Sequence, residues 1–272
     1  MIEQLQQIAE GAGREILRFY SEDFTAERKA DNSPLTLADT ASHEFISKAL
    51  RDLDPSIPIL SEEGADTDYL ARAAWERFWL VDPMDGTKEF IKKTGEFTVN
   101  LALVEGTRAV LGVIYVPVQG LFYWADREGG AHKLTKDRSP VSICCRNANL
   151  DQLTIVASRD HAGPEVKALL GRFPTAETRS MGSSLKFCLI AEGSADIYLR
   201  DVPTMEWDTA AAQCIVEAAG GSVVMLDSEP LTYNKPELRN PSILTLGDRS
   251  LSPSSLFSIP NLPSPQGTGS HS

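Results

Sequence analysis

Residues 78–87 read FWLVDPMDGT, four bulky apolar residues followed by two aspartates three positions apart. The apolar run 78–81 is typical of a buried strand, and Pro83, which has no N–H to give to a sheet, is expected to end it. Asp82 and Asp85 then stand at the end of that strand, where unpaired charges cost several kcal/mol and need cations or hydrogen-bond donors. The spacing alone also fits a turn in which Asp85 caps the following helix.

Two further acidic residues stand at the ends of predicted elements. Glu62 lies in SEEG (61–64), directly after the apolar run 57–60, although a solvated loop is the ordinary interpretation of such a pair of acids. Asp208 is predicted to begin a helix, because apolar residues recur behind it at helical spacing. The positions of that stripe are Ala211, Ala212, Ile215 and Ala219. An acidic residue in a first turn also offsets the helix dipole, so Asp208 alone leaves both interpretations open.

A third feature is the segment GSSLK (182–186), which opens another predicted helix. Small residues and free backbone N–H groups at the start of a helix suit an anion such as phosphate. A serine that caps the helix, followed by an exposed Lys186, is the alternative.

The charge balance limits the partners that the chain can have. There are 26 Lys and Arg against 38 Asp and Glu, a net charge of -12, which argues against nucleic acid and anionic lipid as partners. The four histidines and four cysteines are too scattered for a zinc site, so any metal is expected to be a hard ion held by oxygens. We expect reduced thiols, no signal peptide and no membrane span, hence a cytoplasmic protein. Peripheral attachment to the inner membrane and the oligomeric state stay open.

The pattern along the chain changes near residue 150. The first half has apolar spacing typical of a helix over 2–19, and strand patterns at 97–104, 109–116 and 121–125. A second helix, after a turn at 32–34, is predicted to bury Ala38, Ala41, Phe45, Ala49 and Leu53. The second half alternates a strand at 153–157 with helices at 164–170 and 184–191. We therefore predict an α+β subdomain over 1–150, an α/β subdomain over 151–247 and a flexible Ser/Pro/Gly-rich tail over 248–272.

Several of these segments together resemble one family. SEEG (61–64), DPMDGTKEF (82–90) and WDTAAAQCIVEAAGG (207–221) are similar to the signature regions of the inositol monophosphatase-like family of metal-dependent, lithium-sensitive phosphatases. KADNSPLTLAD (29–39), GEFTVNLALV (95–104) and GSSLKFCLIAEGSADIY (182–198) resemble its CysQ-type 3'(2'),5'-bisphosphate nucleotidases. The resemblance covers residues 1–247. It implies a layered αβαβα sandwich and removal of the 3'-phosphate from adenosine 3',5'-bisphosphate.

The resemblance also implies the roles of individual residues. Two or more Mg²⁺ ions would be held by Glu62, Asp82, the Met84 carbonyl, Asp85 and Asp208, with Asp82 between two ions. Thr87, paired with Asp39, would help Glu62 to position the attacking water. The substrate would contact the residues Glu62, Met84, Asp85, Gly86, Thr87, Gly182, Ser183, Ser184, Lys186 and Asp208.

Substrate choice is expected to lie in residues 200–206, whose sequence matches no single subfamily. The alternatives are a phosphatase for inositol monophosphate or another small phosphomonoester, and a non-catalytic nucleotide or metal sensor on the same scaffold.

Overall fold

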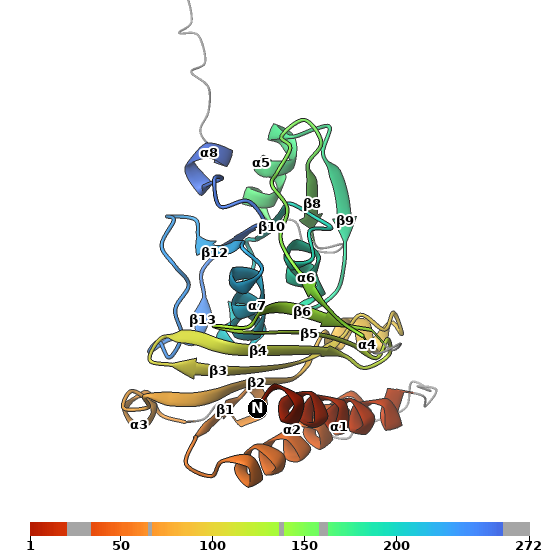
Figure 1. The fold of residues 1–272 in the computed structure, drawn as a ribbon, viewed down its shortest axis with the longest axis vertical. Helices are drawn as coiled ribbons and strands as arrows, with labels where there is room; N and C mark the ends of the chain where they lie inside the picture. Colours follow the sequence, from red (N-terminus) through yellow and green to blue (C-terminus); the bar gives the residue numbers. More distant parts are fainter. Residues whose placement is uncertain (21–33, 65–66, 136–138, 158–162, 258–272) are drawn as a thin grey trace, which may run out of the picture.

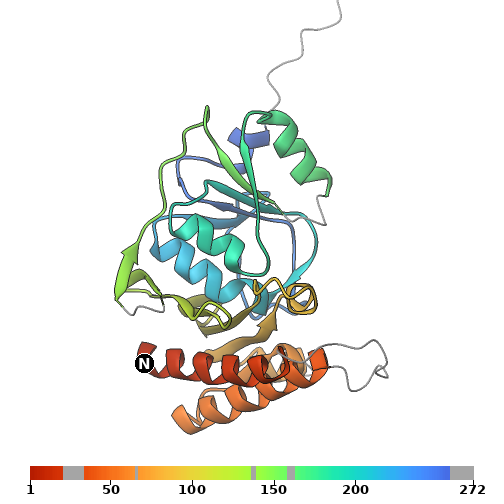
Figure 2. The ribbon, with the colours of Figure 1, turned by 90° about the vertical axis from the view of Figure 1, so that its right-hand side faces the viewer.

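Helix layers and sheet layers alternate through the molecule (Figure 1). The structure is a computed structural model that describes residues 1–20, 34–64, 67–135, 139–157 and 163–257. The outer layer at the N-terminal end consists of α1 (Ile2–Tyr20) and α2 (Pro34–Leu53), which lie side by side in Figure 2. The opposite outer layer holds α5 (Pro164–Arg172) and α8 (Pro253–Phe257). The sequence-based expectation of a layered αβαβα sandwich is therefore confirmed.

The first sheet packs against α1 and α2. Its strands, in spatial order, are β1 (Ile59–Ser61), β2 (Arg77–Asp85), β3 (Thr98–Glu105), β4 (Arg108–Val116), β5 (Leu121–Asp126), β6 (Gly130–Leu134) and β7 (Pro140–Ile143). β1 runs parallel to β2, and the other neighbours are antiparallel. The strands predicted at 97–104 and 109–116 are confirmed as β3 and β4, and they form a hairpin in which Glu105 pairs with Arg108 across a turn where Gly106 has a φ of +59°.

The prediction that Pro83 ends its strand is wrong. β2 continues to Asp85, and its register against β3 shifts between Asp82, which pairs with Asn100, and Asp85, which pairs with Thr98. Between these two pairs β2 advances three residues and β3 advances two, which is a β-bulge. Pro83 lies in this bulge, where it does not need to donate a backbone hydrogen bond to β3. The bulge keeps both aspartates on the strand.

The predicted buried face of α1 is confirmed at Leu5, Ile8, Ala12 and Ile16, whereas that of α2 is confirmed at Ala38 but not at Phe45. The buried positions of α2 are Ala38, Ser42, Ile46, Ser47 and Leu50. Phe45 is 36 % exposed and lies against α1, where a Cβ on Gly11 would come within 2.2 Å of its ring. The apolar stripe is rotated because α2 packs on α1 as well as on the sheet. The turn predicted at 32–34 falls largely outside the described residues.

The middle layer contains α6 (Leu185–Ala191) and α7 (Glu206–Ala218), which share one core with strands of both sheets. The predicted stripe of α7 is buried as expected, but Ala210, Cys214 and Val216 are buried too, which is typical of a helix covered on all sides. The helix begins at Glu206, two residues before the predicted start. A Cβ on Gly112 of β4 would come within 2.4 Å of the Ala211 carbonyl, so glycine allows this close approach to α7.

The second sheet is mixed and covers the far side of α6 and α7. Its order is β12 (Ser222–Met225), β14 (Ile243–Leu246), β10 (Ile197–Arg200), β8 (Thr154–Ala157) and β9 (Glu177–Ser180). The remaining elements are β11 (Thr204–Met205), which pairs with β13 (Arg239–Asn240), the turn Glu62–Gly64, α3 (Tyr69–Arg72) and α4 (Thr87–Ile91).

The last described residues take part in the core. α8 lies within the segment predicted as a flexible tail, yet Leu256 is buried in the cluster between the second sheet and α5. Residues 258–272 lie outside the described residues. The division into subdomains near residue 150 stays a prediction, and α6 and α7 of the second half pack on the first sheet.

Candidate active site

Two acidic residues meet at the carboxyl ends of β1 and β2. The strands are parallel and Ser61 lies opposite Val81, so the next residues, Glu62 and Asp82, come level at one edge of the sheet. Asp82 is 1 % exposed, and its Oδ1 accepts a hydrogen bond of 3.0 Å from the Met84 N–H within the bulge. The bulge therefore fixes one oxygen of Asp82.

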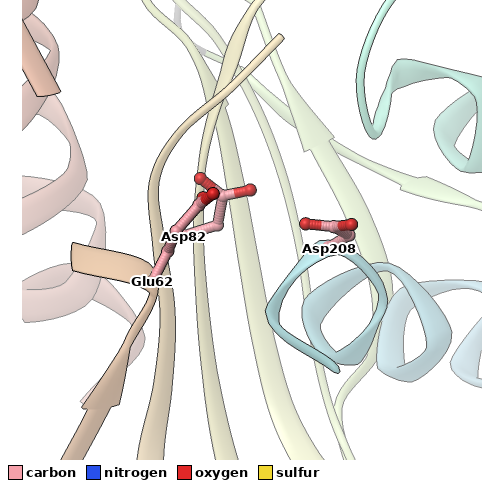
Figure 3. Close-up of side chains that lie close together, drawn as sticks. All are labelled: Glu62, Asp82 and Asp208. Atoms are coloured by element: carbon pink, nitrogen blue, oxygen red, sulfur yellow. The ribbon is translucent and has the colours of Figure 1, made fainter. Parts of the chain in front are cut away.

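Asp208 joins this pair from α7. It is the third residue of the helix, and its Oδ2 accepts a hydrogen bond of 2.8 Å from the Met205 N–H. One carboxylate oxygen from each of Glu62, Asp82 and Asp208 lies within 4.8 Å of the others. Figure 3 shows the side chains of Glu62 and Asp82 beside each other, with Asp208 facing them from the start of α7. We call these three residues the acidic cluster.

Burial and mutual repulsion disfavour the charged form of these carboxyl groups. Burial is the largest cause, and it raises the pKa of Glu62 to about 7 and that of Asp208 to about 7, with Asp85 adding to both shifts. The pKa of Asp82 is raised well above its ordinary value by burial and then by the charges of Asp85, Glu62 and Asp208. Such a cluster is stabilised by a cation.

Asp85 stands at the end of β2, half-buried, beside the acidic cluster. Its Oδ2 accepts a hydrogen bond of 2.9 Å from the hydroxyl of Ser184. The interpretation of Asp85 as a helix cap is wrong, because Gly86 occupies the cap position of α4, with a φ of +101°, and makes no side-chain cap bond. Met84, also predicted as a ligand through its carbonyl, lies in the bulge between the two aspartates, with its side chain buried.

The structure does not join the predicted pair of Thr87 and Asp39 by a hydrogen bond within the described residues. Thr87 is the first residue of α4 and is exposed. Asp39 lies on α2 with Oδ1 buried and without a hydrogen-bond partner. Burial raises the pKa of Asp39 to about 8, and the neighbouring Glu63 and Glu62 add to the shift. Asp39 is therefore electrostatically coupled to the acidic segment after β1.

The segment 182–186 is built differently from its predicted form. The N–H of Gly182 is not free, since it donates to Glu96 Oε2 at 2.9 Å, and Ser184 uses its hydroxyl for Asp85 rather than to cap α6. Ser183 has a φ of +45° and a buried Oγ without a partner among the described residues. Lys186 is 5 % exposed, so the alternative of an exposed lysine is wrong. Its ammonium donates to the Met181 carbonyl at 3.3 Å.

A cavity of about 230 Å³ connects these segments. Asp85 and Asp208 line it together with Lys186 and Arg200, which we call the cationic pair. Burial lowers the pKa of Lys186 to about 8, with Arg200 contributing to this shift and Asp85 opposing it.

Other lining residues include Tyr198 and Thr204, which sequence reasoning did not single out. The only sequence signal for this part of the wall was the position of residues 200–206, where substrate choice was expected.

The sequence matches the profile of the inositol monophosphatase family over residues 1–251. The chain belongs to that family. The match includes the acidic cluster, Asp85 and the segment 182–186, and it ends within the segment predicted as the tail.

Individual relatives agree with this assignment. The 3'(2'),5'-bisphosphate nucleotidase CysQ of Escherichia coli K12 is 44 % identical over 239 residues, covering 87 % of this chain and 95 % of that protein. The crystal structure of CysQ from Bacteroides thetaiotaomicron is 43 % identical with a TM-score of 0.81, covering 89 % of this chain and 95 % of its own. An inositol monophosphatase from Zymomonas mobilis, 24 % identical, shares the fold with a TM-score of 0.78 over 94 % of this chain and 96 % of its own.

Within the described residues, no helix is both long enough and apolar enough to cross a membrane.

Proposed function

We propose that this protein is a Mg²⁺-dependent phosphatase that hydrolyses the 3'-phosphate of adenosine 3',5'-bisphosphate to give AMP and phosphate. The observation that carries the proposal is the meeting of acidic and cationic side chains at one cavity, Asp85 and Asp208 with Lys186 and Arg200. The names of the relatives with 44 % identity support a bisphosphorylated nucleotide as the substrate.

The acidic cluster fits a hard divalent cation. Its donors are carboxylate oxygens close enough to share an ion, and their raised pKa values reflect repulsion that a cation would offset. We assign the Met84 carbonyl and Asp85 to the same ligand set, which would hold two or more Mg²⁺ ions. Bound there, the ions would neutralise phosphate charge and lower the pKa of a water nucleophile.

The chain itself supplies positioning around that set. We assign to Glu62 the orientation of the attacking water, because its carboxylate stands next to Asp82 and keeps part of its side chain exposed. Thr87, exposed on the first turn of α4, and Asp39, half-buried on α2, are assigned to assist it. Gly86, whose positive φ turns the chain from β2 into α4, brings the N-terminal end of α4 to the cavity.

The cationic pair would bind the second phosphate of the substrate. Lys186 is a buried ammonium that donates to one neutral carbonyl, that of Met181, and such a group is stabilised by an anion. Arg200 adds a planar cation suited to phosphate. The partnerless hydroxyl of Ser183 can donate to the same ligand, whereas Gly182 and Ser184 shape the wall through bonds to Glu96 and Asp85. A monophosphate substrate has no second phosphate for the cationic pair to bind.

A phosphate-release assay with several substrates tests the proposal. Adenosine 3',5'-bisphosphate, adenosine 3'-monophosphate and inositol 1-phosphate are compared with Mg²⁺, with EDTA, and with Mg²⁺ plus Li⁺. We expect the bisphosphate to have the highest kcat/KM, EDTA to abolish release, and Li⁺ to inhibit it.

Two results would contradict the proposal. Faster turnover of inositol 1-phosphate would assign the chain to inositol phosphates. Mg²⁺-dependent binding of the bisphosphate without hydrolysis, measured by calorimetry, would indicate a sensor.

A further inference from the structure

A chain of buried hydrogen bonds runs from β3 to Asp85. The Thr98 hydroxyl donates to Asn100 Oδ1 at 2.9 Å, and Asn100 Nδ2 donates to Ser184 Oγ at 2.9 Å. Ser184 Oγ then donates to Asp85 Oδ2, also at 2.9 Å. Thr98, Asn100 and Ser184 are each at most 1 % exposed. The chain is therefore shielded from water until it reaches Asp85.

The direction of this chain follows from the groups at its end. Ser184 has one hydroxyl proton and two neighbouring acceptors, Asp85 Oδ2 and the Asp208 carbonyl at 3.1 Å. An ionised carboxylate and a carbonyl can only accept, so Ser184 must donate toward them and accept from Asn100. This requirement fixes the amide of Asn100 with nitrogen toward Ser184 and oxygen toward Thr98. Reversing the amide would leave the Ser184 oxygen without a donor.

Ser184 also connects the parts of the site that come from distant segments. It contacts the end of β2 through Asp85 and the start of α7 through the Asp208 carbonyl, and it lines the cavity. Asn100 stands behind it on β3, directly opposite Asp82 in the sheet register. Among the described residues, hydrogen bonds connect Asn100 to Asp85 through the Ser184 hydroxyl.

We propose that Ser184 and Asn100 are positioning residues that hold the Asp85 carboxylate in its metal-binding orientation. The inference rests on the proposed function, because it takes Asp85 as a Mg²⁺ ligand. Residues that hydrogen-bond to metal ligands orient them, and removing such a partner typically lowers metal affinity 10–100-fold. Without the Ser184 hydroxyl, Asp85 loses a buried donor and can rotate away from the neighbouring carboxylates.

The test measures Mg²⁺ binding without substrate. Isothermal titration calorimetry gives the Kd of Mg²⁺ for EDTA-treated wild type, Ser184→Ala, Ser184→Thr, Asn100→Ala and the double variant Ser184→Ala/Asn100→Ala, and the Tm in EDTA reports folding. The matched control is Thr245→Val on β14 of the second sheet, which removes a buried hydroxyl that has no hydrogen-bond partner among the described residues.

We expect Ser184→Ala to raise the Kd about 10–100-fold, and Ser184→Thr, which keeps the hydroxyl, to bind more tightly than Ser184→Ala. Asn100→Ala should weaken binding less than Ser184→Ala does, and it should add nothing in the Ser184→Ala background, since it acts through that hydroxyl. Thr245→Val should bind Mg²⁺ as the wild type does.

Unchanged Mg²⁺ affinity in Ser184→Ala, or an additive loss in the double variant, would overturn the inference. A variant with a lower Tm is titrated at a low temperature at which it is folded. At that temperature it should still bind Mg²⁺ more weakly than the wild type does. A wild type that releases phosphate while these variants bind Mg²⁺ normally would refute this inference alone. A wild type that binds no Mg²⁺ would refute the proposed function.

Discussion

Asp208 of the acidic cluster and the cationic pair border one cavity, and burial acts in a similar way on the two sets of charges. The carboxyl groups are gathered with others of the same sign, and the pKa values of Glu62 and Asp208 rise to about 7. Lys186 is buried, its ammonium donates to the Met181 carbonyl, and its pKa falls to about 8. For Asp208 and Lys186, burial favours the neutral form more strongly than the opposite charges nearby favour the charged one.

This comparison indicates that each set is completed by a ligand rather than by the other set. Carboxylates held at a distance from one another that an ion can span are suited to a metal, and a buried ammonium beside an arginine is suited to a phosphate. The cavity would then receive an anionic substrate in spite of the net charge of -12. Metal bound to the acidic cluster would invert the local field that the substrate meets.

The largest expected effect comes from breaking the acidic side. Asp82→Asn keeps the shape of the side chain but removes a charge from the proposed ligand set. We expect kcat for adenosine 3',5'-bisphosphate to fall about a thousandfold, since a catalytic ion supplies several kcal/mol of transition-state stabilisation. Steady-state phosphate release with saturating Mg²⁺ measures this fall in kcat.

The matched control is Asp151→Asn, an exposed aspartate in a turn before β8. It should leave kcat unchanged. A folded Asp82→Asn variant with full activity would remove Asp82 from the ligand set.

Breaking the cationic side should give a smaller and more selective effect. Arg200→Gln removes a charge-assisted interaction worth about 1.5–3 kcal/mol, so kcat/KM for the bisphosphate should fall about 10–100-fold. The value for adenosine 3'-monophosphate should change little, because that substrate lacks the second phosphate.

Arg14→Gln, on the exposed face of α1, is the control and should change neither value. Equal losses on both substrates in Arg200→Gln would mean that Arg200 does not recognise the second phosphate.

The smallest predicted effect is a pH dependence that comes from Lys186. Its ammonium loses a proton near pH 8, so kcat/KM for the bisphosphate should fall several-fold as the pH rises from 7 to 9. Lys186→Arg should move this fall to higher pH, since arginine stays charged. If the pH profile of kcat/KM is the same for Lys186→Arg and wild type, the titration belongs to another group.

The same shift predicts a change in stability. Below about pH 8 Lys186 is protonated in both the folded and the unfolded state, so the full cost of burying its charge lowers the free energy of unfolding. Between about 8 and 10.5 only the unfolded state binds the proton, so the contribution of Lys186 to stability should rise with pH. Urea denaturation of the wild type and Lys186→Met across this pH range measures the slope of the free energy of unfolding against pH. Identical slopes would contradict the assignment.

Much of the acidic side could be predicted from the sequence. Asp82 and Glu62 each follow an apolar strand, and Asp208 precedes an apolar helical stripe, so local patterns place all three at the ends of elements. Their meeting was implied by resemblance, and the structure confirms it as geometry. What local patterns could not predict is the bulge at Pro83, because it depends on the register with β3.

The cationic side was harder to predict for a physical reason. Arg200 lies at the end of β10, and its approach to Lys186 depends on how β10 packs against α6 rather than on any spacing in the sequence. Asn100 likewise reads as an ordinary polar position within an apolar strand. Its importance comes from Ser184, 84 residues further along the chain.

The thermal stability of Asp208→Asn and wild type at pH 8.5, with EDTA and with Mg²⁺, tests directly whether the acidic cluster is a metal site. We expect Asp208→Asn to melt at a higher temperature than wild type in EDTA, because repulsion within the acidic cluster is reduced. We also expect Mg²⁺ to raise the Tm of wild type far more than that of the variant. A lower Tm for Asp208→Asn in EDTA, with an unchanged response to Mg²⁺, would contradict the claim that these buried carboxylates are held for a metal.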